Sequence, residues 1–361
     1  MADSDPQQRP PLSPVNLALR LGAIGAVTVL IAAALAYTGG YFSPERVTPA
    51  RVVDVLEHNN GEHPGFRRNH PKGICVTGYF DSNGAGVELS SAEVFSATRT
   101  PVQGRFSLPT GNPYSPDSAA PLRSMALRFQ QANGQQWRTG MNSMAVFPVG
   151  TPEAFFGLLQ ATAPDPATGK PDPKKAGAFF AAHPETGAFL AWVKTAKPAA
   201  SFTTETYNSV NAFYLTNAAG VRQTVRWSMV ADAQADSAAP TADDYLQADL
   251  QQRLANGPQR WSLILTLANP GDPSNDASKA WSGEHRQVNA GTLVIEHEQA
   301  QDNGACRDIN YDPLILPSGI EGSDDPLLAA RSAAYAASYQ RRAGEVESLP
   351  HHANAAQEQR P

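Results

Sequence analysis

Short apolar runs separated by glycine- and proline-rich turns recur along most of the chain, with such turns at residues 110–113 and 269–273. This punctuation is typical of a β-rich fold. Two of the runs, 202–215 and 221–231, flank the turn-rich residues 217–220 and are expected to pair as strands. The other predicted strands span residues 73–80, 102–108, 124–129, 143–149, 261–267 and 291–297.

Helical segments are expected between these strands. The predicted helices span residues 51–60, 151–162, 174–182 and 246–254. Strands with helices inserted between them indicate an α+β domain around a closed antiparallel barrel. A chain of 361 residues, 41% of them hydrophobic, is long and apolar enough to bury a large core. Length alone allows two domains, but barrels of this size commonly form one.

A further helix is predicted near the C-terminus. Ser323 is the expected N-cap, Asp324 and Asp325 suit the positive end of the helix dipole, and Pro326 fits the first turn. Residues that recur at helical spacing follow, namely Leu327, Leu328, Arg331, Tyr335 and Tyr339. Residues 345–361 are polar and are expected to form a disordered tail.

The N-terminal segment carries a targeting signal. Residues 21–42 contain no charged side chain, and as a helix they are long enough to cross a hydrocarbon core of about 30 Å. The more strongly apolar residues 21–36 suit the core of a signal peptide, with an AxA-like cleavage site at residues 34–36. A cleaved signal and a retained single anchor therefore both stay open.

Charge sets the direction of export. Arg9 and Arg20 precede the apolar segment and place the N-terminus on the cytoplasmic side. Residues 1–45 are thus expected to be a leader with a signal or anchor segment. Residues 46–344 are expected to be an exported domain, periplasmic in a bacterium, with no membrane contact except through the N-terminal segment.

Charge and cysteine content narrow the possible partners. The net charge is −6, from 28 basic and 34 acidic residues, so no basic surface for nucleic acid is indicated. The two cysteines are Cys75 and Cys306. An oxidising compartment permits a disulfide between them, but a buried free thiol is the favoured state for Cys75. No CxxC or CxxCH motif occurs, which argues against covalent haem attachment and a typical zinc site.

The C-terminal helix contains the first candidate chemistry. Arg331 and Tyr335 lie four residues apart, about one helical turn, so their side chains share one face. A guanidinium beside a phenol favours the phenolate, which is an anionic ligand for haem iron. A lone pair at this spacing is more often a packing feature, so the interpretation depends on further motifs.

The second candidate is a histidine. Residues 67–73 read RRNHPKG, and His70 precedes a proline that is expected to keep its backbone extended. An imidazole here suits general acid–base chemistry near neutral pH. Taken alone, a histidine flanked by basic residues is more often a surface residue.

From about residue 67 to residue 344 the chain resembles the haem catalase superfamily. RxxHxKG resembles the family's distal-histidine motif, and Arg105-Phe106-Ser107 resembles its RFS element. The C-terminal block, from Asp312-Pro313 through LPSGIE to Arg331 and Tyr335, matches without gaps. Residues 203–227 and 244–261 resemble the following strand pair and the helix and strand after it. The chain ends soon after the predicted helix that carries Tyr335, so it looks like the small catalase-related haem peroxidases.

The resemblance implies an α+β fold with a catalase-like closed antiparallel β-barrel, inserted helices and a C-terminal helix. It implies haem b bound to Tyr335 through the iron, with Arg331 hydrogen-bonded to the phenolate. His70 is the implied acid–base group, and Ser107 its hydrogen-bond partner. Phe155 is expected beside the haem. The implied partners of the haem propionates are Arg67, Arg105 and Arg342.

One position departs from the family pattern. The family has an Asn-Asn pair in a glycine-led turn, whereas this chain has Gly140-Met141-Asn142-Ser143. A gapless match puts Met141 at the position of the distal amide, and Asn142 fills that role only if the turn shifts by one residue. Without a positioned amide, dismutation of peroxide is expected to be weak.

The function implied is a haem peroxidase that reduces hydrogen peroxide or organic hydroperoxides with a small organic electron donor and has weak or no catalase activity. Two alternatives stay open. One is an exported haem-binding or carrier protein without turnover, and the other is a hydroperoxide-rearranging catalase-like enzyme. A homodimer is compatible with the sequence.

Overall fold

The computed structural model describes residues 13–39, 41, 43, 46–197, 199–234 and 242–348; the side chains of residues 303, 347 and 348 are outside this description. The chain divides into two compact units, Met1–Thr48 and Pro49–Pro361.

The first unit contains one helix, α1 (Pro14–Thr38), among its described residues. Its 25 residues have a mean hydropathy of 2.1, so the helix is long and apolar enough to cross a membrane. Ser13 caps its start by accepting a hydrogen bond from the Asn16 N–H (3.3 Å), and Pro14 occupies the first helical position. A signal sequence near the N-terminus meets the same criteria, so both predicted alternatives remain.

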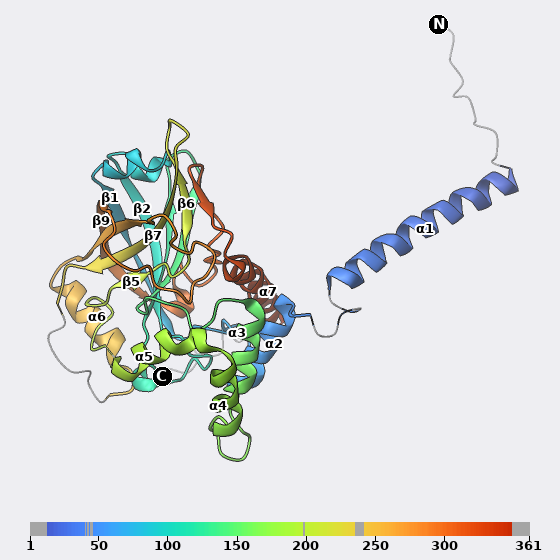
Figure 1. The fold of residues 1–361 in the computed structure, drawn as a ribbon, viewed down its shortest axis with the longest axis horizontal. Helices are drawn as coiled ribbons and strands as arrows, with labels where there is room; N and C mark the ends of the chain where they lie inside the picture. Colours follow the sequence, from blue (N-terminus) through green and yellow to red (C-terminus); the bar gives the residue numbers. More distant parts are fainter. Residues whose placement is uncertain are drawn as a thin grey trace, which may run out of the picture. The chain divides into compact units, whose positions relative to one another are not determined.

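The second unit is built on an antiparallel barrel (Figure 1). Eight strands close into a ring in the order β1-β2-β3-β4-β5-β7-β8-β9, and β9 returns to β1. Strands β6 and β10 extend from the edge of β7 beside β5. The strands are β1 (Gly73–Ser82), β2 (Arg99–Ser107), β3 (Ser124–Gln130), β4 (Gln136–Asn142), β5 (Tyr207–Asn208), β6 (Phe213–Thr216), β7 (Arg222–Ala231), β8 (Gln259–Leu267), β9 (Gln287–Ala300) and β10 (Ile320–Gly322).

Aromatic side chains fill the barrel. Along β4, Trp137 and Met141 are buried while their neighbours are less so, which is the two-residue period of a strand with one buried face. Trp137 stacks on Phe129 with ring centroids 4.6 Å apart and meets Trp227 edge to face. Trp261 is also fully buried. These rings make one continuous core, so the closed sheet has no hollow interior.

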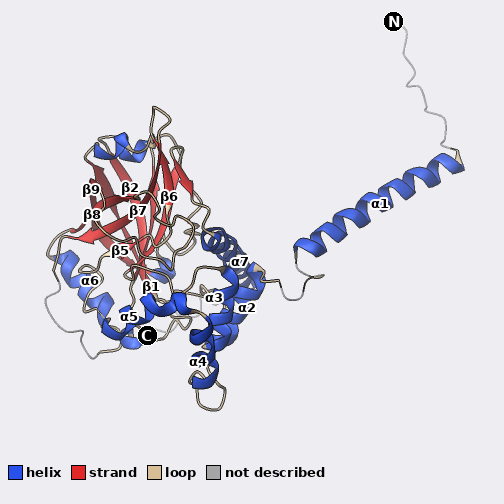
Figure 2. Ribbon diagram, in the orientation of Figure 1, coloured by secondary structure: helices blue, strands red, loops and turns tan. Residues whose placement is uncertain are grey.

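Helices surround the lower part of the barrel in Figure 2, and α2, α3 and α7 pack against one another. The α-helices of this unit are α2 (Pro49–Asn60), α3 (Pro152–Ala161), α4 (Pro173–Ala182), α5 (Gly187–Thr195), α6 (Tyr245–Ala255) and α7 (Pro326–Ser348). Short 3-10 turns are η1 (Ala85–Glu88), η2 (Glu93–Phe95), η3 (Asp117–Ala119), η4 (Pro184–Thr186) and η5 (Gln301–Asn303).

The predicted closed barrel and most predicted elements are confirmed, with three exceptions. Residues 143–149 form no strand; β4 lies just before them, and the predicted Gly140–Ser143 turn is mostly strand. The turn was predicted from Gly140, although Trp137 and Met141 follow the alternation of a strand. Residues 202–215 contain only the short β5 and β6, because Val210 between them has a positive φ of 65°. Helix α5 was not predicted.

Both ends of α7 differ from the prediction. Asp325, not Ser323, caps the helix, because its Oδ1 accepts a hydrogen bond from the Leu327 N–H (2.9 Å). Ser323 Oγ accepts from the Asp325 N–H (3.4 Å) and so supports the cap. The helix continues to Ser348, where a tail was expected from residue 345. Glu345 forms an ion pair with Arg68, which explains the extension; the rest of the predicted tail, residues 349–361, lies outside the described residues.

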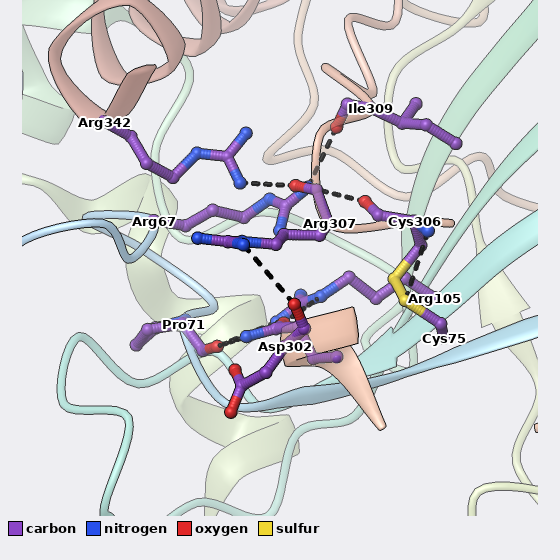
Figure 3. Close-up of a disulfide and its surroundings, with 10 residues drawn as sticks. Arg67, Pro71, Cys75, Arg105, Asp302, Cys306, Arg307, Ile309 and Arg342 are labelled. Carbon is purple, nitrogen blue, oxygen red and sulfur yellow. Dashed lines mark hydrogen bonds between the residues drawn. A yellow bond between two sulfur atoms is a disulfide. The ribbon is translucent and has the colours of Figure 1, made fainter. Parts of the chain in front are cut away.

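The predicted free thiol at Cys75 is wrong. Cys75 on β1 and Cys306 form a disulfide across a sequence separation of 231 residues. Sequence distance does not oppose such a bond, and the fold places the segment after β9 beside β1 (Figure 3). The only two cysteines of the chain are therefore oxidised, as an oxidising compartment allows.

The β1–β9 ladder leaves no room for a side chain at Gly78. The ladder shifts register between Thr77 and Gly78, and a Cβ on Gly78 would lie 1.9 Å from the Val294 carbonyl oxygen. We expect Gly78→Ala to lower the free energy of unfolding by about 1–3 kcal/mol, because backbone and not a flexible side chain opposes the methyl group. Urea-induced unfolding of the variant measures this.

The matched control is Gly177→Ala on α4, where no atom of the described residues lies within 4 Å of the added Cβ. A helix-interior glycine costs about 0.5–1 kcal/mol relative to alanine, so this control should stabilise or be neutral. Equal effects of the two substitutions would contradict the close approach at Gly78.

Candidate active site

A pocket of about 1390 Å³, measured out to its open mouth, is bounded by α7, the barrel strands β2 to β4 and the apolar side of α2. Its apolar lining includes Val53, Leu56, Met125, Phe147 and Leu327. The pocket brings together every residue proposed from the sequence, namely Arg67, His70, Arg105, Ser107, Asn142, Phe155, Arg331, Tyr335 and Arg342. These residues are spread over 276 positions of the chain, so only the fold unites them.

His70 is held in an unusual backbone conformation. Its φ is 57°, so the predicted extended backbone before Pro71 is wrong. The His70 N–H donates to the Thr110 carbonyl (2.9 Å) and to Asn69 Oδ1 (3.0 Å), which stabilise the left-handed turn. A non-glycine residue in this region costs free energy and is commonly found at functional sites.

The imidazole of His70 is half-buried, with a buried Nδ1 atom, and electrically neutral. Burial, and then the positive charges of Arg105, Arg331 and Arg67, lower the pKa of His70 from 6.5 to about 3. Among the described residues, Nδ1 of His70 has no hydrogen-bond partner. The expected hydrogen bond from Ser107 to this nitrogen is therefore absent. A neutral imidazole with an unpaired buried nitrogen can bind a polar ligand and accept its proton.

The strand β4 separates Met141 from Asn142. Met141 is 1% exposed and belongs to the barrel core, although its edge borders the pocket. Asn142 points to the opposite face, as successive strand residues do, and lines the pocket. Its Oδ1 accepts a hydrogen bond from Ser124 Oγ (2.6 Å), so the amide is fixed and its NH₂ group remains for a ligand.

Arg331 and Tyr335 share one face of α7, as predicted. The Arg331 guanidinium donates to the Gly140 carbonyl (2.9 Å) and to Asn211 Oδ1, and it lies 5.9 Å from the Tyr335 ring centroid. Within the described part of the chain no hydrogen bond joins Arg331 to the Tyr335 hydroxyl, so that expectation is not met. The positive charge is nevertheless close enough to act on the ring electrostatically.

Asn211 was not proposed as a site residue, yet it holds Arg331 in place. Its side-chain NH₂ donates to Asp325 Oδ2 (2.8 Å), so the α7 cap, the amide and the guanidinium form one chain of hydrogen bonds. The turn is tight: the Asn211 N–H donates to the Ser209 carbonyl (2.8 Å) across Val210. A β-branched residue with positive φ is rare, and the sequence contains no signal for it.

Arg67, Arg105 and Arg342 form a buried positive cluster. Burial, with Arg342 next in effect, lowers the pKa of Arg67 to about 10; burial also lowers the pKa of Arg105 and of Arg342. Arg67 donates to the carbonyls of Cys306, Arg307 and Ile309. Arg342 also donates to the Arg307 carbonyl. Arg105 donates to the Pro71 carbonyl and to Gln301 Oε1. In the described ranges none of the three forms an ion pair with a carboxylate. Leaving a buried charge unpaired costs free energy.

Phe155 on α3 also reaches the pocket. Its ring lies 5.4 Å from that of Phe147, and both pack against the small buried cluster of Val210, Ala277 and Leu327. Thr151 caps α3 by accepting from the Ala154 N–H (3.1 Å), so the ring is presented from a well-defined helix start. The two phenylalanine rings, tilted by 46° to each other, provide apolar surface at the pocket, and Phe147 was not predicted from the sequence.

Solved structures with a similar fold show to which class of proteins this fold belongs. Catalase A from Saccharomyces cerevisiae has a similar fold, with a TM-score of 0.70 and 20% identity, over 81% of this chain and 64% of that chain. A fungal catalase superposes with a TM-score of 0.69 at 18% identity, over 95% of this chain and 66% of that one. At these identities the likeness concerns the fold, and the fold is that of the catalases.

The sequence gives the family itself. Residues 37–359 match the model of the family described as catalase, and the chain belongs to that family. A catalase-related peroxidase from Synechococcus elongatus is 37% identical over 336 residues, covering 91% of this chain and 95% of that protein. One from Mycolicibacterium paratuberculosis is 31% identical, with coverages of 82% and 96%.

Membership of the catalase family implies a haem cofactor, and the pocket fits one. Three buried guanidinium groups without carboxylate partners suit the two propionates of haem. The apolar walls suit the porphyrin. Among the described residues no group of three His, Cys, Asp or Glu side chains is placed to hold a metal ion.

The lowered pKa of His70 makes a prediction about acid sensitivity. Because the unfolded chain binds a proton at His70 below about pH 6.5 and the folded chain does so only near pH 3, stability falls as the pH drops through this range. We expect His70→Gln to lessen that loss by up to about 1.4 kcal/mol per pH unit. Urea-induced unfolding of the haem-free chain at several pH values measures it.

Ser107→Ala is the control, because it alters the same pocket without removing a titrating group. It should shift the unfolding free energy by a similar amount at each pH. Parallel pH profiles for wild type and His70→Gln would show that His70 is not held in the neutral form.

Proposed function

We propose that this protein is a haem-dependent peroxidase that reduces hydrogen peroxide or organic hydroperoxides with electrons from a small organic donor. The observation that carries the proposal is the convergence of a neutral His70 and of Tyr335 on one pocket. The two relatives matched over almost their whole length bear the name catalase-related peroxidase, which supports it.

Tyr335 is the residue assigned to the iron, as phenolate. Arg331, held by Gly140 and Asn211, places a fixed positive charge 5.9 Å from the centre of the Tyr335 ring. Arg67, Arg105 and Arg342 bind the propionates, and Phe155 lies against the porphyrin. The haem is haem b, bound without thioether links, because both cysteines of the chain are in the disulfide.

His70 moves the proton. Being neutral at physiological pH, it accepts the proton from the peroxide oxygen that binds first and returns it to the other oxygen, which leaves as water or alcohol. The amide of Asn142, fixed through Ser124, orients the peroxide by donating a hydrogen bond. When bound, haem would supply the two electrons that break the O–O bond. Two electrons from the donor, with two protons, would then restore the haem and release the second oxygen as water.

The donor is proposed to be organic and the catalase activity weak. Asn142, and not the core residue Met141, supplies the amide at the pocket, so the proposed weak catalase activity does not rest on a missing amide. The relatives named above are called peroxidases. A homodimer remains compatible with the molecule.

Export to the periplasm is also part of the proposal. An apolar N-terminal helix of 25 residues and a disulfide in the following unit both fit an exported protein. The helix acts either as a cleaved signal or as a single anchor.

Tyr335→Phe tests the iron ligand. The purified full chain reconstituted with haem should show a ferric absorption spectrum that is lost or displaced in the variant, because the phenyl ring has no oxygen to bind iron. Tyr339→Phe is the matched control, since it removes a pocket hydroxyl one turn further along α7. A spectrum unchanged in Tyr335→Phe but altered in Tyr339→Phe would assign the ligand to Tyr339. Absence of stoichiometric haem in the wild type would refute the enzyme proposal.

His70→Ala separates a peroxidase from a haem carrier. We expect haem to remain bound while the rate of donor oxidation at limiting peroxide falls by about 10²–10⁴-fold, the usual contribution of a general acid–base group. Stopped-flow measurement of donor oxidation gives the rate, and haem absorption gives occupancy.

Other outcomes point to other functions. A carrier would bind haem equally with and without His70 and oxidise no donor in either form. Consumption of a lipid hydroperoxide without donor would indicate rearrangement. Oxygen evolution as fast as in an ordinary catalase would contradict the weak catalase activity.

A further inference from the structure

The disulfide lies directly behind the positive cluster of the pocket. Cys306 belongs to the segment between η5 and β10, and Cys75 is on β1 of the barrel wall. Both are almost fully buried, at 1% and 2% exposure. Figure 3 shows the bond beside Arg105, and Arg67 reaches the Cys306 carbonyl. A covalent bond therefore connects a loop at the pocket to the rigid barrel.

Two of the three guanidinium groups donate hydrogen bonds to backbone carbonyls of this loop. Arg67 donates to the carbonyls of Cys306 (3.2 Å), Arg307 (3.1 Å) and Ile309 (2.8 Å). Arg342, from α7, donates to the Arg307 carbonyl. The Cys306 N–H in turn approaches Cys75 Sγ at 3.2 Å. The loop backbone thus sets the positions of two arginines that come from distant parts of the chain.

The disulfide is the covalent link between the loop and the barrel. Besides it, Arg138 donates a hydrogen bond to the Asn310 carbonyl. Among the described residues, the buried apolar contacts of the loop form a cluster of Cys75, Cys306, Ile309 and Tyr311, apart from the large barrel core. The two guanidinium groups repel each other, since Arg342 lowers the pKa of Arg67. Arginine side chains also have many rotamers to lose on ordering. Fixed carbonyl dipoles offset both effects only while the loop keeps its place.

We propose that the Cys75–Cys306 disulfide is a positioning element that holds Arg67 and Arg342 in place for the carboxylates of haem. The proposal rests on the proposed function, because it assigns the arginines to the haem propionates. It adds two residues, neither of which touches the cofactor, to those that determine how tightly the cofactor is held. The effect should therefore be confined to ligands that carry carboxylates.

The test compares haem with its dimethyl ester, whose propionates are uncharged. Both are titrated into the full haem-free chain and into a Cys75→Ala/Cys306→Ala variant, followed by absorption. Loss of one charge-assisted hydrogen bond corresponds to about a tenfold change in dissociation constant. We expect the variant to bind haem about tenfold more weakly and the ester unchanged. Arg67→Met should give the same selective loss, and the combined variant should lose less than the product of the two.

Three outcomes would overturn the inference. Equal weakening of haem and ester would show a general loss of stability, and no weakening of either would show that the loop holds without the bond. Fully multiplicative losses would separate the disulfide from Arg67.

Failure of the proposed function can be distinguished from failure of the inference about the disulfide. If the wild type binds neither ligand, the haem assignment fails. Amide hydrogen exchange of residues 304–311 in the haem-free chain then decides the structural part. Faster exchange in the cysteine variant supports a loop held by the disulfide, and unchanged exchange overturns it.

Discussion

Closure of the barrel by the β7–β8 ladder is the constraint on which the rest of the structure depends. It makes the eight-stranded ring continuous, so β2, β3 and β4 keep fixed positions through both neighbours. Gly140 and Asn142 on β4 and Ser107 on β2 then form a rigid wall. The α7 helix docks on this wall through the hydrogen bond from Arg331 to the Gly140 carbonyl.

Ion pairs between α2 and α7, rather than apolar burial, complete the pocket. α2 has only one buried residue, Val53, so apolar burial alone holds it weakly. Charged side chains connect it to α7: Arg341 pairs with Asp54 and Glu57, and buried Arg68 joins Glu57. These pairs cluster into a network, which counts for more than isolated surface pairs. The apolar side of α2 is thereby kept over the cofactor pocket.

The pocket combines a neutral histidine with several buried positive charges, and one cause produces both. Burial disfavours every charged form, and the arginines cannot avoid it because their pKa starts so high. The imidazole loses its proton instead, aided by the arginine charges. An anionic cofactor would neutralise the cluster that this arrangement leaves unpaired. The same electrostatics therefore suits haem binding and keeps the His70 imidazole unprotonated.

The sequence by itself determined the barrel class and most strands and helices, because ordered motifs and strand or helix periods are local properties. It also named His70, Arg331 and Tyr335 as candidates, and the fold brings these three to one pocket. Tertiary structure alone decided what depends on distant partners. The left-handed backbone of His70 comes from its bond to Thr110, and the strained Val210 turn serves Asn211 and Arg331. The disulfide formed because the fold brought Cys306 to β1. Asn142 rather than Met141 faces the pocket because β4 extends through the predicted turn, and strand pairing, not the local glycine, set its face.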